Sequence, residues 1–114
     1  MDSLEYHESV ELANYLEDLK REGKILRYTH IPNETWTKSW NQKMRNVRQG
    51  VKKGFPDYII LFPDRAIFIE MKRVKGGVVS PEQKEWIADL QRLGFRAEIC
   101  KGFLEAKALI EYYL

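Results

Sequence analysis

Three charged side chains stand where two apolar segments begin or end, and together they could form a catalytic site. Asp57 precedes one apolar run, and Glu70 and Lys72 end a second one, Ala-Ile-Phe-Ile. Charged residues that end an apolar strand need a partner or a function, because an unpaired buried charge is costly. Two carboxylates beside an ammonium group suit Mg²⁺-assisted attack of water on a phosphodiester.

A hairpin between the two apolar segments would bring these side chains together. Pro63 and Asp64 suit the central positions of a turn. If they form its tip, counting back along both strands places Asp57 opposite Glu70, on one face and with Cβ atoms roughly 5 Å apart. Lys72 shares that face, because alternate residues of a strand do. Two carboxylates so placed repel each other unless a cation lies between them. The same register pairs Leu61 with Ala66 and Ile59 with Phe68.

The segment over residues 35–56 is basic and contains no acidic side chain. Such a local excess suits a polyanion such as DNA, and a solvated basic helix is the alternative. Trp36 and Trp40 in this segment could stack on bases or could anchor a helix to the core. The residues expected to contact DNA are Lys38, Lys43, Arg45, Arg48, Lys52 and Lys53.

The first helix is expected to begin after Ser3 as its N-cap and to end near residue 21. Glu8 projects into the middle of its apolar stripe, with Glu5 near the edge and Glu11 further round. A carboxylate in a buried stripe suggests a function. The alternative is a solvated first-turn glutamate that favours the helix dipole.

Gln83 and His30 each have two interpretations. Ser80-Pro81-Glu-Gln83 predicts a helix start with a capping box, and Gln83 either completes that box alone or also contacts an active site. His30 ends a strand that Pro32 stops. It has no metal-ligand spacing to the other histidine of the chain, so we expect a packed or solvated side chain rather than a ligand.

Composition places the chain among globular proteins. It has 114 residues, a net charge of +2 and one cysteine, Cys100, which suits a reducing compartment. No apolar run reaches the roughly 18 residues that would span a membrane, and the N-terminus lacks the features of a signal peptide. We therefore expect a cytoplasmic protein with no membrane segment.

The element pattern predicts an α/β fold in a single domain over residues 1–114. After the first helix come a strand over 24–31, a short basic helix over 39–49, the hairpin, a helix over 80–93, a strand over 95–100 and a helix over 103–113. The helix between the hairpin and the last strand predicts a parallel crossover, and hence a mixed sheet. In the helix over 80–93, the expected buried face is Trp86, Ile87, Leu90 and Leu93.

These motifs, taken in order, resemble the VRR-NUC nucleases, a branch of the PD-(D/E)xK phosphodiesterase superfamily. The likeness is carried by the glutamate-bearing first helix, the basic segment, Gly54-Phe-Pro-Asp57, Ile69-Glu-Met-Lys72 and Ser80-Pro-Glu-Gln83. It extends from about residue 5 to residue 112 and is similar to stand-alone members such as phages carry. It implies a restriction-endonuclease-like core, a mixed sheet flanked by helices.

The resemblance also implies roles for individual residues. Asp57, Glu70 and the main-chain carbonyl of Met71 would bind Mg²⁺ or Mn²⁺, and Lys72 would orient the attacking water. Gln83 would lie beside the site. Among the first-helix glutamates, Glu8 is our choice to complete the acidic site, with Glu5 second.

The implied activity is metal-dependent hydrolysis of DNA phosphodiesters by a structure-specific endonuclease. Branched DNA, including four-way (Holliday) junctions, is the expected substrate, and paired cleavage of a junction predicts a C2 homodimer. No small-molecule cofactor is expected. The alternatives are a nuclease with a flap-trimming or restriction role and a non-catalytic DNA-binding module.

Overall fold

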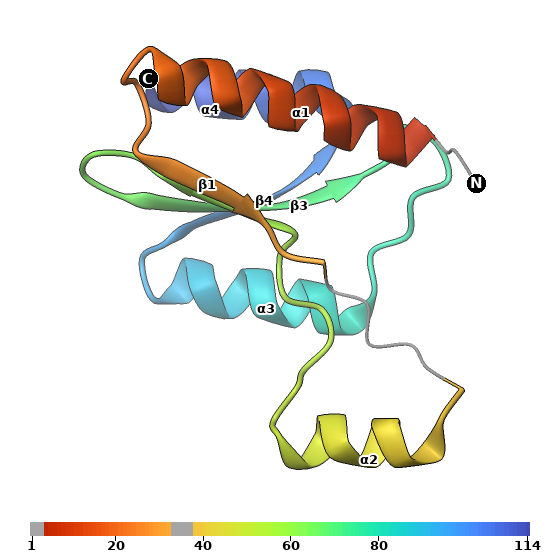
Figure 1. Ribbon diagram of the computed structural model, residues 1–114. Coiled ribbons are helices and arrows are strands. Elements are labelled where there is room, and N and C mark those ends of the chain that lie inside the picture. The colour runs from red at the N-terminus through yellow and green to blue at the C-terminus, as the bar shows by residue number, and fades with distance from the viewer. Residues whose placement is uncertain (1–3, 33–37) are drawn as a thin grey trace.

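The computed structural model describes residues 4–32 and 38–114, with side chains from residue 6 onward. A four-stranded sheet lies between two helices on one face and one helix on the other, as Figure 1 shows. The expected cap at Ser3 and the expected contacts of Trp36 fall outside the described residues. The elements in chain order are α1 (Leu4–Arg21), β1 (Arg27–His30), α2 (Trp40–Arg48), β2 (Tyr58–Leu61), β3 (Ala66–Lys72), α3 (Pro81–Arg92), β4 (Arg96–Lys101) and α4 (Gly102–Tyr113).

The sheet has the order β1-β2-β3-β4 and is mixed, as predicted. Strand β2 pairs antiparallel with both β1 and β3, and β4 lies parallel to β3 after the crossover through α3. In the hairpin, Leu61 pairs with Ala66 and Ile59 with Phe68, which confirms the predicted register. Continuing that register by two residues beyond Ile59 places Asp57 beside Glu70.

The main core lies between the sheet and the pair α1 and α4. The apolar stripe of α1 is buried there as expected, with Leu12 and Leu16 fully enclosed. A smaller core under α3 contains Ile87, Leu90 and Ala97. The predicted burial of Leu93 is wrong: it is 72% exposed, because α3 ends at Arg92 and the chain turns away there.

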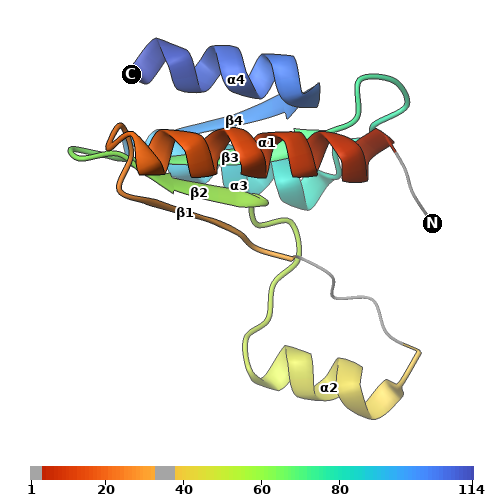
Figure 2. The same cartoon turned by 45° about the horizontal axis from the view of Figure 1, so that its top comes forward.

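Helix α2 stands apart from the sheet and from the other helices, as Figures 1 and 2 show. None of its nine residues is buried, and Trp40 is 70% exposed. Trp40 therefore does not anchor this helix to the core. Its N-terminus is capped by Ser39, which accepts a hydrogen bond from the backbone N–H of Gln42 at 3.2 Å.

None of the described helices is long and apolar enough to cross a membrane.

Candidate active site

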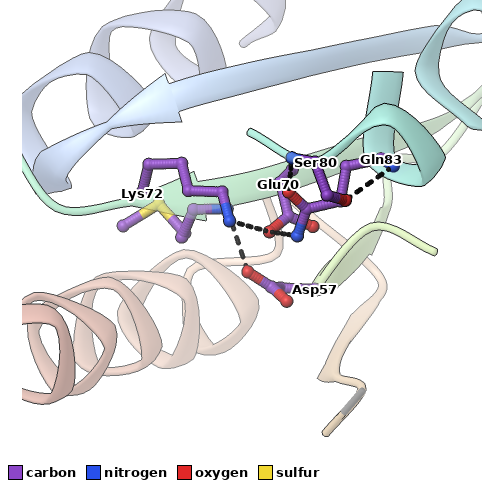
Figure 3. Close-up of polar contacts among 6 residues, drawn as sticks. Asp57, Glu70, Lys72, Ser80 and Gln83 are labelled. Atoms are coloured by element: carbon purple, nitrogen blue, oxygen red, sulfur yellow. Dashed lines mark hydrogen bonds and ion pairs between the residues drawn. The ribbon is translucent and has the colours of Figure 1, made fainter. Parts of the chain in front are cut away.

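The predicted catalytic side chains meet in one cleft of about 390 Å³ at the open end of the hairpin. Figure 3 shows Asp57, Glu70, Lys72 and Gln83 grouped there, contributed by the start of β2, by β3 and by the first turn of α3. The lining residues are Ser9, His30, Pro32, Lys53, Gly54, Asp57, Glu70, Lys72, Ser80 and Gln83.

Glu70 is the buried carboxylate of this cleft, with only 2% of the residue exposed. Its Oε2 atom accepts a hydrogen bond from Gln83 Nε2 at 2.9 Å and lies 3.4 Å from Lys72 Nζ. Its Oε1 atom is buried and has no hydrogen-bond partner among the described residues. A buried carboxylate oxygen without a donor requires a ligand or a proton.

The surroundings make Glu70 hold its proton unusually well. Burial, and then the negative charge of Asp57, raise the pKa of Glu70 to about 8, against the attraction of Lys72. Burial also raises the pKa of Asp57, while the Met71 N–H opposes that rise. Two neighbouring carboxyl groups with raised pKa values are typical of a site where both groups ionise only when a cation is bound.

Asp57 is held by the backbone of the adjacent strand. Its Oδ2 atom accepts a hydrogen bond from the Met71 N–H at 3.0 Å, which fixes the carboxylate beside Glu70. The chain reaches this position through Gly54, at φ +96°, where an added Cβ would lie 2.7 Å from the carbonyl carbon of Glu82. Glycine is therefore required for the segment before Asp57 to pass so close to α3.

Gln83 has both of the roles that the sequence left open. Its Oε1 atom accepts from the Ser80 N–H at 2.9 Å and its backbone N–H donates to Ser80 Oγ at 3.2 Å, which completes the capping box. Its Nε2 group donates to Glu70. One amide thus starts α3 and holds the buried carboxylate.

His30, which the sequence predicts to be packed or solvated rather than a metal ligand, also lines the cleft. Its ring stacks on Tyr58, with centroids 4.6 Å apart and planes inclined by 12°. Burial raises the pKa of Asp57, and the nearby His30 opposes that rise. The signal that places it here is the pairing of His30 with Tyr58, the neighbour of Asp57.

Glu8 does not line the cleft. Its Oε1 atom accepts a hydrogen bond from the Phe103 N–H at 2.9 Å, at the first turn of α4. Helix α4 has no side-chain cap from its own N-cap residue, Lys101, so this carboxylate supplies one from α1. Glu11 is exposed, and the side chain of Glu5 is not described. A catalytic role for Glu8 has no geometric support and stays a prediction.

The predicted DNA-binding residues divide into two groups. All six are exposed, but Lys53 also lines the cleft and lies 3.9 Å from Glu82. The residues away from the cleft, on α2 or its flanking segments, are Lys38, Lys43, Arg45, Arg48 and Lys52.

The cleft fits a hard divalent cation. No group of three or more His, Cys, Asp or Glu side chains suited to a metal occurs among the described residues, and the acidic side chains that line the cleft are Asp57 and Glu70. Both are carboxylates, and Glu70 Oε1 lacks a donor. Mg²⁺ commonly binds one or two carboxylates and keeps several waters, so two acids suffice.

The comparisons with known proteins agree with this fold. The family model for the VRR-NUC domain matches residues 3–104. A solved structure named "VRR_NUC domain protein" has a similar fold, with a TM-score of 0.71 and 23% identity over 100% of this chain and 90% of that chain. No curated protein matches the chain.

Proposed function

The chain belongs to the VRR-NUC domain family, nucleases of the PD-(D/E)xK type, and from this premise we propose that it is a divalent-metal-dependent DNA endonuclease. The observation that supports this proposal is the Glu70 carboxylate, which is buried beside Asp57 with one oxygen lacking a donor. A purely structural carboxylate would have its oxygens satisfied by the protein.

Asp57 and Glu70 would hold Mg²⁺ or Mn²⁺, with the main-chain carbonyl of Met71 as the further ligand. A divalent ion bound there would neutralise charge on the scissile phosphate and make a bound water more acidic. The Met71 N–H fixes Asp57, and Gln83 fixes one oxygen of Glu70, so both acids are positioned before the substrate arrives.

Lys72 would act on the water or on the phosphate. Its ammonium lies 3.4 Å from Glu70, and its side chain is only 13% exposed. A cation so placed, in a partly desolvated cleft, would orient the attacking water or stabilise the charge that develops on the phosphate. No residue pair here suggests a covalent intermediate, so direct attack by water, which passes its proton to solvent or to a group at the site, is the simpler route.

Branched DNA, with four-way junctions as the main case, is the proposed substrate. The basic segment around α2 would hold phosphates without reading sequence, which makes binding strongly dependent on salt. Paired cleavage of a junction needs two active sites related by a two-fold axis, so we include a C2 homodimer in the proposal. Sedimentation of the protein with and without junction DNA tests it, and monomers alone at micromolar concentration would contradict it.

Cleavage of labelled DNA tests the activity. Four-way junction, flap and plain duplex are incubated at equal concentration with Mg²⁺ or Mn²⁺, beside an Asp57→Ala control. We expect the junction to be cut fastest and the variant to be inactive. Equal rates on all three substrates would reject structure specificity, and a preference for flaps would indicate trimming. Binding without any nicks would support a non-catalytic DNA-binding module.

A further inference from the structure

A second groove leaves the active-site cleft along the edge strand of the sheet. It has a volume of about 300 Å³ and lies between the C-terminal half of α1 and β1, which run side by side in Figure 1. His30 lines both the groove and the cleft, so the two hollows meet at this residue. The groove is lined by Glu17, Lys20, Arg27, Tyr28, Thr29 and His30.

The charges in this groove favour an anion. Lys20 and Arg27 are exposed, and neither forms an ion pair within the part of the chain that the structure describes. The one carboxylate, on Glu17, already accepts a hydrogen bond from the Tyr28 hydroxyl at 2.8 Å. The two cations therefore outnumber the one carboxylate, and the Tyr28 hydrogen bond holds that carboxylate against the strand.

His30 is held rigidly at the junction of the two hollows. Its ring rests on Tyr58, which is only 1% exposed and donates its hydroxyl to the Ser9 carbonyl at 3.3 Å. A ring restrained by stacking loses less side-chain entropy when it contacts a ligand.

The length of the groove matches a short run of nucleotides. From His30 to Arg27 is three residues of strand, which span about 10 Å. One strand of duplex DNA rises about 3.4 Å per phosphate along the helix axis, and its phosphates lie further apart than this because the backbone winds around that axis, so the groove accommodates about two to three phosphates.

We propose that this groove is a second DNA-backbone site, which holds phosphates about two to four nucleotides from the scissile one through His30, Arg27 and Lys20. The proposal rests on the proposed function, because it takes the cleft as the place where DNA is cut. It adds a contact surface distinct from the basic segment over residues 38–53, and it predicts that both sides of the cleft engage the substrate.

Salt-dependent binding tests the groove without requiring cleavage. The double variant Lys20→Gln/Arg27→Gln is compared with Arg92→Gln/Lys107→Gln, which removes the same charge from α3 and α4. Dissociation constants for a labelled junction are measured in EDTA across a salt series. We expect the groove variant to lose on the order of tenfold in affinity and the salt slope to fall by about 1 to 2, since each phosphate contact contributes about 0.9. Equal losses in the two double variants, or an unchanged slope, would overturn the proposal.

Replacing single phosphates by uncharged methylphosphonates shows which phosphates of the DNA contact the groove. Methylphosphonates are placed one at a time along the strand, and binding is measured for the wild type and for the groove variant. We expect a window of about three positions at which the substitution weakens the wild type but not the variant. Absence of such a window would refute the groove even if the protein cuts DNA. A window without any nicking would retain the groove and refute the nuclease proposal.

Discussion

Replacement of Glu70 by glutamine should stabilise the metal-free protein at neutral pH while abolishing cleavage. Glu70 is 2% exposed, and burial together with Asp57 raises its pKa to about 8 from an ordinary 4.5. Between these two pH values the unfolded chain is ionised and the folded one keeps its proton. The free energy of unfolding of the wild type therefore falls as pH rises through this window.

The size of the effect follows from the same two values. From 4.5 to pH 7 is about 2.5 pH units, and each unit corresponds to about 1.4 kcal/mol. The wild type should thus lose about 3 to 4 kcal/mol from this group. Glutamine does not ionise, has nearly the same shape and keeps an acceptor for Gln83, so Glu70→Gln should lack this loss.

Urea denaturation in EDTA, followed by tryptophan fluorescence at pH 4.5, 6, 7 and 8, measures the difference. The two proteins should be similar at pH 4.5 and diverge as pH rises, with the variant more stable. Glu98→Gln on β4 is the matched control, because Glu98 is exposed. Added Mg²⁺ should stabilise the wild type and the control but not Glu70→Gln.

Two results would refute the reasoning. One is a Glu70→Gln variant that is less stable than the wild type at pH 7 and follows the same pH dependence. The other is an equal stabilisation of both proteins by Mg²⁺, which would remove Glu70 from the metal site.

Three further predictions follow from individual contacts. Gly54→Ala should lose about 1 to 3 kcal/mol of unfolding free energy and most activity, because the added Cβ would meet the backbone of Glu82. Gly23→Ala is also at positive φ but has nothing within 4 Å, so it should lose less stability and stay active; equal losses in urea denaturation would contradict this. Glu8→Ala should lose about 1 kcal/mol of unfolding free energy, because it removes the cap of α4, and should leave Mg²⁺ affinity unchanged. Loss of cleavage at unchanged stability would instead place Glu8 in the active site. Gln83→Ala should weaken Mg²⁺ binding, measured by calorimetry, about tenfold, because it removes the hydrogen bond to Glu70. Ser80→Ala removes only the helix cap and should lower the stability without changing Mg²⁺ affinity. Equal Mg²⁺ affinities in the two variants would refute a role for Gln83 at the carboxylate.

The hairpin and its register could be predicted because their causes are local. Pro63 and Asp64 mark the turn, and the two-residue period of a strand then determines which side chains face each other. The cluster of Asp57, Glu70 and Lys72 follows from that counting alone. The capping box of α3 is equally local, so its residues were identifiable from four positions of sequence.

The contacts that the sequence left undecided all join distant segments. Helical periodicity shows that Glu8 faces the apolar stripe, but not that the first turn of α4 lies 95 residues further along the chain beside it. His30 could not be assigned to the cleft without the β1–β2 pairing, which joins strands separated by the whole of α2. Gln83 needed the position of α3 against β3 before its second hydrogen bond could be seen.

The exposure of helix α2 determines which mutations this protein can tolerate. Because none of its residues is buried, insertions, deletions and charge reversals within it should leave the folding of the sheet and its three packed helices almost unaffected. Variation among relatives should therefore concentrate in this segment. Under the proposed function, exchanging α2 between relatives should change how tightly DNA is held and leave the hydrolysis itself unchanged.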